Sequence, residues 1–367
     1  MLKRYRLKDF DYRLVIYLVV LTVLGILLIG SAARSKQTMQ VIGLFLGITA
    51  MMVLSVIDYN YILQFYWIIY VVNIVLLVFV RIVGSNAGGA TRWISILGIR
   101  FQPSELSKIL LILFFAKMFS KYEDRLNDWK ILLTMIVLAI VPLYLIKEQP
   151  DLSTSIVVAI IFCVMIYIAG LKRKIVLFTL GGVFAAFTAF IVLILNYGRV
   201  ILNDYQYKRI MAWIDPTHYA DTAYQQQNSI MAIGSGQLLG KGLNNNVISS
   251  VKNGNFISEP QTDFIFAVTG EELGFVGSCI IIILLLVISL ECIKIGKKAH
   301  DLQGKLICCG MATLVGFQSY INICVATGLM PNTGLPLPFV SYGVTSLLTS
   351  FIGMGVVLNI GLQQRKY

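Results

Sequence analysis

Stretches of 18 or more apolar residues recur along this chain, with polar segments between them. Such a stretch is long enough for an α-helix to cross a hydrocarbon core of roughly 30 Å. The pattern therefore predicts an all-α integral membrane protein of about ten transmembrane helices. The predicted spans are residues 13–33, 39–57, 62–83, 104–119, 131–147, 152–170, 175–197, 262–292, 303–328 and 341–363.

Two polar segments are too long to be simple connections between neighbouring spans. They are residues 84–103 and 198–261, and we expect both to be extracytoplasmic loops, the larger one between spans seven and eight. A third segment, 330–341, is short and contains three prolines. Such a kinked backbone is tolerated at membrane depth where it lines a cavity. No repeat of fixed period is present, so residues 1–367 are predicted to form a single membrane domain.

The composition agrees with a lipid environment. Of the 367 residues, 57% are apolar and only 13% are charged, whereas soluble domains carry about 25% charged residues. The basic N-terminus, residues 3–8, precedes an apolar run that ends near Ala33. A cleaved signal peptide is the competing interpretation, but this run is too long for one, and the topology needs it as a span.

The net charge of +12 reflects Lys and Arg residues that gather between the spans. Eighteen of the 30 fall on the side of the N-terminus. This positive-inside bias predicts a multi-pass protein of the cytoplasmic (inner) membrane with both termini cytoplasmic. We expect membrane lipids with anionic head groups, and no nucleic acid, as partners of the basic loops. The six cysteines form no CxxC pair and the two histidines fall on opposite sides of the membrane, which argues against a histidine-based metal site.

A proline and an ion pair mark the start of the predicted fourth span. Pro103 suits the first turn of a helix, where Glu105 is favoured by the helix dipole. Lys108 follows three residues later on the same face. The pair is compatible with a self-paired helix start or with the wall of a polar cavity that binds an anionic substrate. Arg92, Arg100 and Gln102, just upstream, favour the cavity. Anchoring at the membrane interface is the alternative role for Arg92 and Trp93.

Three further polar positions belong to the same outer face. Asp151 follows a proline and opens the sixth span, either as an N-cap or as a side chain that lines the cavity. In the large loop, Arg209 follows another cation, and Lys241 lies among glycines 234, 236, 240 and 242. A glycine-rich turn with one lysine suits a phosphate, although its spacing is not that of a nucleotide-binding loop. A plain structural loop is the alternative.

Asp263 is the most informative single residue. It stands where the polar loop becomes an apolar helix, and residues 264–266 after it are apolar. A partly desolvated carboxylate has a raised affinity for protons, as a general base requires. A helix cap is the alternative role for this side chain.

Two glutamates follow Asp263 two turns deeper in the predicted span. We expect Glu271 and Glu272 to pair with a basic residue on a neighbouring helix, because an unpaired charge is costly there. An alternative register begins the true span near Leu273 and leaves residues 262–272 as an interfacial helix.

Six sequence blocks, in this order, resemble the SEDS family (shape, elongation, division and sporulation), which includes RodA, FtsW and SpoVE. The blocks are TRWISILGIRFQPSELSK, EQPDLST, YKRIMAWIDP, YQQQNSIMAIGSGQLLGKG, EPQTDFIFAVTGEELG and PNTGLPLPFVSYG. The resemblance covers nearly the whole chain. Two local departures are Val344, where the family commonly has a glycine, and Gln237, in a loop that often reads GSGG. We expect them to affect the flexibility of these turns rather than activity.

The resemblance implies peptidoglycan glycosyltransfer from lipid II at the outer face of the membrane, with inversion of configuration at the sugar. The position that matches the family's essential aspartate is Asp263, and Glu105, Lys108 and Asp151 match other polar positions of a central cavity. The resemblance also implies a class B penicillin-binding protein, a transpeptidase, as a partner. This chain shows no transpeptidase motif, so we expect crosslinking to be supplied by that separate protein.

The expected chemistry follows from the charge of the leaving diphosphate. The predicted substrate-binding residues are Arg92, Gln102, Glu105, Lys108, Asp151, Arg209 and Lys241. Their cationic members are candidates to stabilise that charge, and Asp263 would remove the proton from the acceptor hydroxyl. A divalent cation, Mg²⁺ or Mn²⁺, would bridge the diphosphate and Glu105 or Asp263. No organic cofactor is expected.

Two other functions would use some of the same features. A transporter that flips lipid II needs the cations and the cavity, but it needs no base beside an acceptor. A noncatalytic scaffold that recruits the transpeptidase has no use for buried polar residues, whose cost within a membrane is high.

Overall fold

The computed structural model of the protein describes residues 10–87, 90–96, 99–149, 151–173, 175, 204–244 and 256–363. Its helices are α1 (Tyr12–Ala32), α2 (Arg34–Val56), α3 (Tyr59–Gln64), α4 (Tyr66–Val83), α5 (Pro103–Lys121), η2 (Glu123–Arg125), α6 (Trp129–Lys147), α7 (Leu152–Ile168), α9 (Asp204–Ile214), α10 (Ala220–Ser235), α11 (Ile265–Lys297), α12 (Leu302–Ala326) and α13 (Val344–Leu362). The strands are β1 (Ser85–Ala87), β2 (Ala90–Ile96) and β3 (Ile99–Phe101). The predicted seventh span, 175–197, lies outside the described residues except for its first position.

Each of the other nine predicted spans corresponds to a helix, and the predicted fold class is confirmed. Seven helices of the described part are long and apolar enough to cross a membrane, namely α1, α2, α4, α6, α11, α12 and α13. α7 is apolar but has only 17 residues, and α5 carries the charged pair Glu105 and Lys108. α1, with 21 residues, rises about 32 Å, which matches the thickness of a hydrocarbon core.

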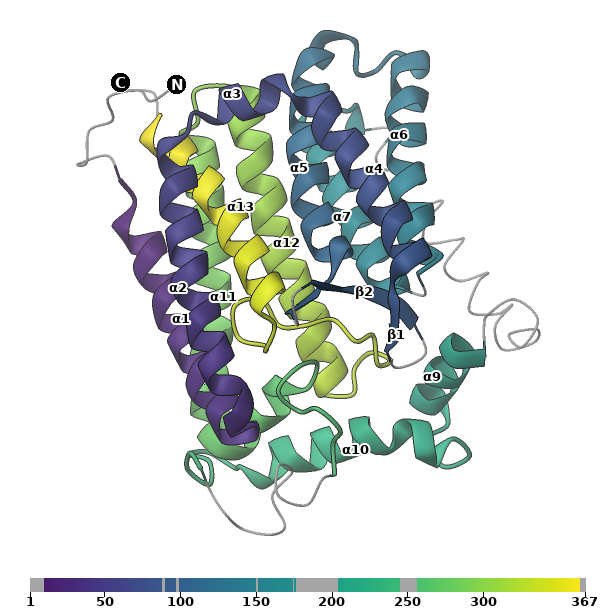
Figure 1. The fold of residues 1–367 in the computed structure, drawn as a ribbon, viewed down its shortest axis with the longest axis vertical. Helices are drawn as coiled ribbons and strands as arrows, with labels where there is room; N and C mark the ends of the chain where they lie inside the picture. The colour runs from purple at the N-terminus through teal and green to yellow at the C-terminus, as the bar shows by residue number, and fades with distance from the viewer. Residues whose placement is uncertain are drawn as a thin grey trace.

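The helices stand side by side as one bundle (Figure 1). α1 begins and α13 ends at the same end of the bundle, which we call the terminal end. α10 lies across the opposite end, the α10 end, beside residues 327–343, the connecting segment that joins α12 to α13. α12 packs against α5, α7, α11 and α13 and is the most buried of the candidate spans. Polar side chains on α12 are therefore enclosed largely by other helices.

α11 is divided at Gly274, next to Leu273, where the alternative interpretation begins the span. Gly274 has φ +64° and ψ −161°, which are not helical angles. A Cβ atom at this position would lie 2.3 Å from the Gly240 nitrogen, so only glycine permits this close approach. The nitrogen that follows the break, Phe275 N, donates to Gln237 O at 2.8 Å. The turn after α10 therefore occupies the place where α11 changes direction.

The large loop contains two helices, α9 and α10, which the sequence pattern did not predict. α10 packs on α11 and α12 and bonds the end of α12. Gln226 Nε2 donates to Val325 O at 2.8 Å, and Ser229 Oγ donates to Ala326 O at 2.7 Å. The last carbonyl groups of a helix have no partner within it, so these side chains complete the hydrogen bonding of α12.

The segment 84–103 contains a small sheet where the prediction had only a loop. Its antiparallel strands have the order β1-β2-β3, and Ile94 pairs with Phe101 in the register of β2 and β3. β-Branched and aromatic residues favour strands, but this run is too short to give a periodic signal. The sheet packs on α4 and α5 through β2 and leads directly into Pro103 at the start of α5.

Candidate functional site

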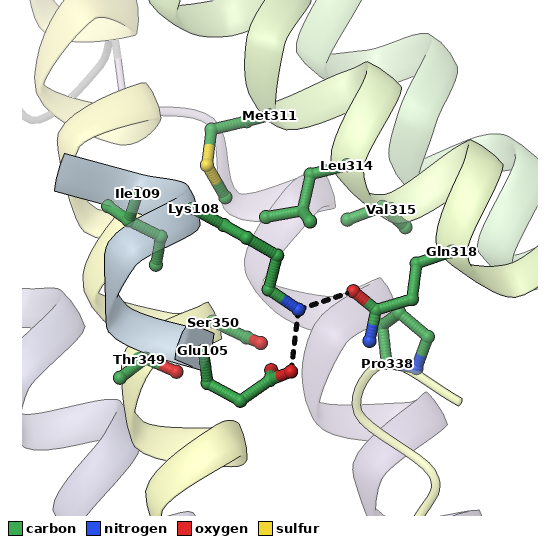
Figure 2. A pocket seen from close by; sticks show the side chains of 10 residues that line it. All are labelled: Glu105, Lys108, Ile109, Met311, Leu314, Val315, Gln318, Pro338, Thr349 and Ser350. Carbon is green, nitrogen blue, oxygen red and sulfur yellow. Dashed lines mark hydrogen bonds and ion pairs between the residues drawn. The ribbon is translucent and has the colours of Figure 1, made fainter. Parts of the chain in front are cut away.

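A buried ion pair joins α5, α12 and α13 (Figure 2). Lys108 Nζ lies 2.6 Å from Glu105 Oε1 and donates to Gln318 Oε1 of α12 at 2.7 Å. The second oxygen of Glu105 accepts a hydrogen bond from Ser346 Oγ of α13 at 2.9 Å. The side chains of Lys108 and Glu105 are only 1% and 4% exposed. Because an isolated charge is costly in such surroundings, each member of the pair needs the other.

A small cavity lies against the ion pair. The space that the centre of a water molecule can occupy in it is ≈ 10 Å³, which is room for about one water molecule. Glu105, Lys108 and Gln318 line it together with Pro338 of the connecting segment and several apolar side chains. Asp263 is not among its lining residues. In this conformation the cavity is too small for a sugar or a diphosphate.

Asp151 caps α7 and also contacts the start of α5. Its Oδ1 atom accepts from Thr154 N at 3.2 Å, as the N-cap interpretation predicted. Its Oδ2 atom accepts from Gln102 Nε2 and from Ser104 Oγ, both at 3.3 Å. The carboxylate is buried, so Asp151 and Gln102 hold the first turns of α5 and α7 together.

Two charged side chains, Asp263 and Arg209, meet at one glycine of the connecting segment. A Cβ atom placed on Gly334 would lie 3.4 Å from Asp263 Oδ2 and 3.6 Å from Arg209 Nη1. Asp263 is half-buried. The N-cap residue of α11 is Phe264, so Asp263 is not the cap that the alternative interpretation proposed. The fold thus brings a carboxylate and a guanidinium from separate parts of the sequence to the same short stretch of backbone.

Amide side chains of α12 hold the connecting segment from within the bundle. Gln318 Nε2 donates to Pro336 O at 2.9 Å. Asn322 Nδ2 donates to Leu335 O at 2.7 Å and to the backbone carbonyl of Asp263 at 2.8 Å. Because the two amides are four residues apart, they lie on one face of α12. That face connects the buried ion pair, through Gln318, with the backbone of Asp263.

Two other helices bond the same segment near Gly334. Arg209 Nη1 of α9 donates to Asn332 O at 3.2 Å. Ser153 Oγ of α7 donates to Thr333 O at 2.9 Å. Carbonyl groups on both sides of Gly334 are therefore held by side chains from α7, α9 and α12, which fixes the backbone beside Asp263.

The residues before Asp263 are bonded to the end of the connecting segment. Ser341 Oγ donates to Thr262 O at 2.6 Å, and Tyr342 N donates to Gln261 O at 2.8 Å. These bonds hold the backbone on the N-terminal side of Asp263, whereas Asn322 holds its own carbonyl. The position of the carboxylate thus depends on tertiary contacts from both directions.

The connecting segment also has an unusual backbone. Gly334 has φ +72° and Phe339 has φ +64°. The left-handed region costs roughly 1–2 kcal/mol for a residue with a side chain. Phe339 is buried and its ring lies 5.5 Å from that of Phe351. Strain of this kind persists where the surroundings determine the backbone, and it clusters at functional sites.

Lys241 lies in another cluster. Its Nζ atom is 2.9 Å from Glu271 Oε1, and its backbone nitrogen donates to Glu271 O at 3.0 Å. Glu271 therefore has a basic partner, as predicted. That partner lies on the turn after α10, whereas the prediction placed it on a neighbouring helix. Glu272 accepts a hydrogen bond from Ser31 Oγ of α1. The contacts of Lys241 attach the glycine-rich turn to the first part of α11, and Ser31 joins the same part of α11 to α1.

Arg92 is in β2, but its side chain lies outside the described part of the structure. Gln318 and Asn322 are central to the site because they bond Lys108, the connecting segment and the backbone of Asp263. Neither residue was predicted from the sequence. Two amides four residues apart in an apolar span were a usable signal, because polar groups within a membrane are expensive and need partners.

The described residues offer no group of three or more His, Cys, Asp or Glu side chains that could hold a metal ion. Both oxygens of Glu105 are engaged, one by the Lys108 ammonium and the other by Ser346. A hard cation prefers free carboxylate oxygens, so Glu105 does not fit a metal in this arrangement. Asp263 is the remaining predicted ligand.

Sequence comparison finds close matches over the full length of the described bundle. The profile of the FtsW, RodA and SpoVE family, described as "Cell cycle protein", matches residues 11–366. A protein of Geobacter sulfurreducens is 34% identical over 378 residues, covering 96% of this chain and 95% of its own length. That relative is named a probable peptidoglycan glycosyltransferase FtsW.

Two solved structures have the same fold. One comes from work on the structural coordination of polymerization and crosslinking by a peptidoglycan synthase complex, with a TM-score of 0.79 and 28% identity. It covers 96% of this chain and 97% of its own. The other is the rod shape determining protein RodA of Thermus thermophilus, with a TM-score of 0.71, 27% identity and 98% of each chain covered.

Proposed function

This chain belongs to the FtsW, RodA and SpoVE family of cell cycle proteins, and on that premise we propose that glycosyl transfer takes place where Asp263 and Arg209 meet the connecting segment. The chain is a multi-pass membrane protein and a peptidoglycan glycosyltransferase that polymerises lipid II. A lipid II transporter is not favoured, since the relatives are named for glycosyl transfer. The observation that carries the proposed site is the approach of both charged groups to Gly334.

We infer that the terminal end of the bundle is cytoplasmic and that the α10 end faces outward from the cytoplasmic membrane. The terminal end carries Lys121, Arg125, Lys172, Lys297 and Lys298, all exposed. Cytoplasmic loops of membrane proteins carry an excess of Lys and Arg. Asp263 and the connecting segment would then lie at the outer leaflet, where the transferred sugars can extend away from the membrane.

Asp263 would act as the general base. Its carboxylate would take the proton of the acceptor hydroxyl while that oxygen attacks the anomeric carbon of the donor sugar. The bond from the anomeric carbon to the diphosphate oxygen would break, and the polyprenyl diphosphate would leave. Direct displacement with one base inverts the configuration, by analogy with inverting glycosidases. The half-buried position of Asp263 before the apolar start of α11 supports this role.

Arg209 would stabilise the charge that develops on the leaving diphosphate. Its Nη1 atom lies near Gly334, as does the carboxylate of Asp263, and a guanidinium binds phosphate oxygens in a fixed fork geometry. Lys108 would stabilise the diphosphate charge from the interior of the bundle and without direct contact, because its Nζ atom is bonded to Glu105 and Gln318. Asp151 and Gln102 would hold the neighbouring turns of α5 and α7. Lys241 and Arg92 remain predicted contacts of the substrate.

A divalent cation, Mg²⁺ or Mn²⁺, remains a prediction. Asp263 would hold it together with oxygen atoms of the diphosphate, and the bound ion would neutralise part of the leaving-group charge. The partner remains a prediction as well. A class B penicillin-binding protein would supply crosslinking, in keeping with the peptidoglycan synthase complex in which a similar structure was solved.

The replacement Asp263→Asn tests the proposed site. The amide keeps the size of the carboxylate but cannot accept the proton, so polymerisation of labelled lipid II should fall by about 10²–10⁴-fold. The purified chain with its transpeptidase would be assayed by gel separation of the polymer.

The same assay with a chelator, followed by added Mg²⁺ or Mn²⁺, tests whether a cation takes part.

Asp221→Asn provides the matched control. Asp221 is an exposed carboxylate in the first turn of α10, so the same change there should leave polymerisation near the level of the unmodified chain. Thermal melting of both variants would check that they are folded. Substantial polymer from a folded Asp263→Asn variant would remove Asp263 from the role of base.

A further inference from the structure

A second cavity lies at the terminal end of the bundle, away from Asp263. Its volume is ≈ 390 Å³, within the size range of small-molecule sites. The last turn of α7, the last turns of α11 and the first turns of α12 form its walls. None of its lining residues belongs to the site described above.

Three cations line this cavity, and none of its lining residues is acidic. They are Arg173, Lys297 and Lys305, and all three are exposed. Among the described residues, no carboxylate lies within ion-pair distance of them. Lys294, one turn earlier on α11, shows the contrast, because its Nζ atom is 2.7 Å from Glu291 Oε1. The cavity therefore concentrates positive charge that the described chain does not neutralise.

The cations and the apolar side chains occupy different depths. Lys297 and Lys305 belong to the helix ends, whereas Ile293 of α11 and Cys309 of α12 lie four residues further into the bundle. Four residues of helix correspond to about 6 Å along its axis. Ile168 and the half-exposed Tyr167 add apolar surface at the end of α7. The cavity thus has a basic rim and an apolar floor on the side of the membrane interior.

We propose that this cavity binds the head group of an anionic phospholipid. Its phosphate would lie among Arg173, Lys297 and Lys305, because Arg and Lys donate charge-assisted hydrogen bonds to phosphate oxygens. The glycerol and the first acyl carbons would lie on Ile168 and Ile293. A basic pocket between transmembrane helices is the type of site that binds such head groups.

A bound lipid would connect the helices that position the proposed site of transfer. α7, α11 and α12 supply walls of the cavity. Of these helices, α7 carries Ser153 and α11 begins just after Asp263. α12 carries Gln318 and Asn322, the two amides that hold the connecting segment. A ligand that binds only the folded state stabilises it by mass action, so the lipid would stabilise this arrangement of helices.

The test is lipid binding by the purified full chain in detergent micelles. Phosphatidylglycerol should raise the melting temperature, whereas zwitterionic phosphatidylcholine should not. The variant Lys297→Gln/Lys305→Gln should bind phosphatidylglycerol about 30-fold more weakly, from the usual contribution of each cation near a lipid surface. The control Lys130→Gln/Lys298→Gln removes the same charge from exposed positions at the same end of the bundle, outside the cavity, and should bind as the unmodified chain does.

Three results would overturn the proposal. The first is an equal loss of binding in the control variant, which would indicate general attraction of the basic surface. The second is equal stabilisation by glycerol phosphate or inorganic phosphate, which would indicate a site for soluble anions. The third is the absence of any stabilisation by phosphatidylglycerol. If the double variant melts early without lipid, Arg173→Gln, at a residue beyond the end of α7, replaces it in the same comparison.

Discussion

The ammonium of Lys108 is buried inside the bundle, so its charge is neutralised by neighbouring side chains and not by water. Glu105 and Gln318 bond its ammonium at 2.6 and 2.7 Å. Burying two charges is repaid only when geometry and further hydrogen bonds are good, and Ser346 provides one of these bonds to Glu105. The pair therefore serves mainly to fix the relation of α5, α12 and α13.

Lys108→Met should destabilise the protein by about 3–5 kcal/mol, because it leaves Glu105 charged and buried without its partner. The double variant Glu105→Gln/Lys108→Met should recover most of this loss, since no unpaired charge remains. Thermal melting in detergent measures both effects. Lys121→Met, at the exposed end of the same helix, should change the melting temperature little. A double variant no more stable than the single one would contradict this account.

Gly334→Ala should lower polymerisation by at least tenfold. The new Cβ would touch both Asp263 Oδ2 and Arg209 Nη1, at 3.4 and 3.6 Å, and alanine is disfavoured at φ +72°. A displacement of about 1 Å at a reacting group can cost two orders of magnitude in rate. Gel analysis of the polymer gives the result.

Gly316→Ala is the control for that change. Gly316 lies within α12, and a Cβ there would meet only Ser289 Oγ, at 3.6 Å. Alanine is the better helix former, so this variant should be fully active and at least as stable. Normal activity of Gly334→Ala would show that the backbone at Gly334 does not position the two charged groups.

At the scale of elements, the turn after α10 and the break in α11 depend on each other. Phe275 N and Val276 N, which follow the break, donate to Gln237 O and Leu238 O at 2.8 and 3.1 Å. Gln237 has φ +49°, a conformation that suits glycine. The resemblance to GSGG loops implies a glycine at this position, and glycine would adopt the conformation without steric cost.

Gln237→Gly should stabilise the protein by about 1 kcal/mol, because glycine adopts the left-handed conformation without steric cost. The same replacement at Gln227, an exposed position inside α10, should destabilise by about 1 kcal/mol. Melting temperatures of the two variants should therefore move in opposite directions. A decrease for both would indicate that the side chain of Gln237 makes a contribution larger than the backbone strain.

For the whole molecule, the bundle is organised around α12 and the segment that follows it. The connecting segment receives side-chain hydrogen bonds from α7, α9 and α12. α10 bonds the end of α12 on the same side. The two ends of the bundle therefore differ, with an organised polar site at the α10 end and an excess of exposed cations at the terminal end.

Cysteine labelling can test the orientation of the whole chain. In a variant without its native cysteines, Leu239→Cys should react with a membrane-impermeant maleimide in intact spheroplasts, since Leu239 is 76% exposed at the α10 end. Lys298→Cys, at the terminal end, should react only after the membrane is permeabilised. The opposite pattern would reverse the orientation and place the proposed site of transfer on the cytoplasmic side.

The sequence by itself determined the membrane class, the positions of the described spans and the candidates Asp263, Glu105 and Lys108. Apolar length against the thickness of a bilayer is a local property of the chain, and so is a charge at the boundary of an apolar run. The positions of the charged residues and the six family blocks are likewise properties of the sequence.

Only the tertiary structure decided which of these residues act together. Asp263 and Arg209 are brought to Gly334, whereas Lys241 is paired with Glu271, and nothing in the local sequence separates these outcomes. The break in α11 and the helices of the large loop likewise depend on contacts between distant segments. Hydrogen bonds to a non-helical backbone are set by packing, so their partners cannot be read from periodicity or composition.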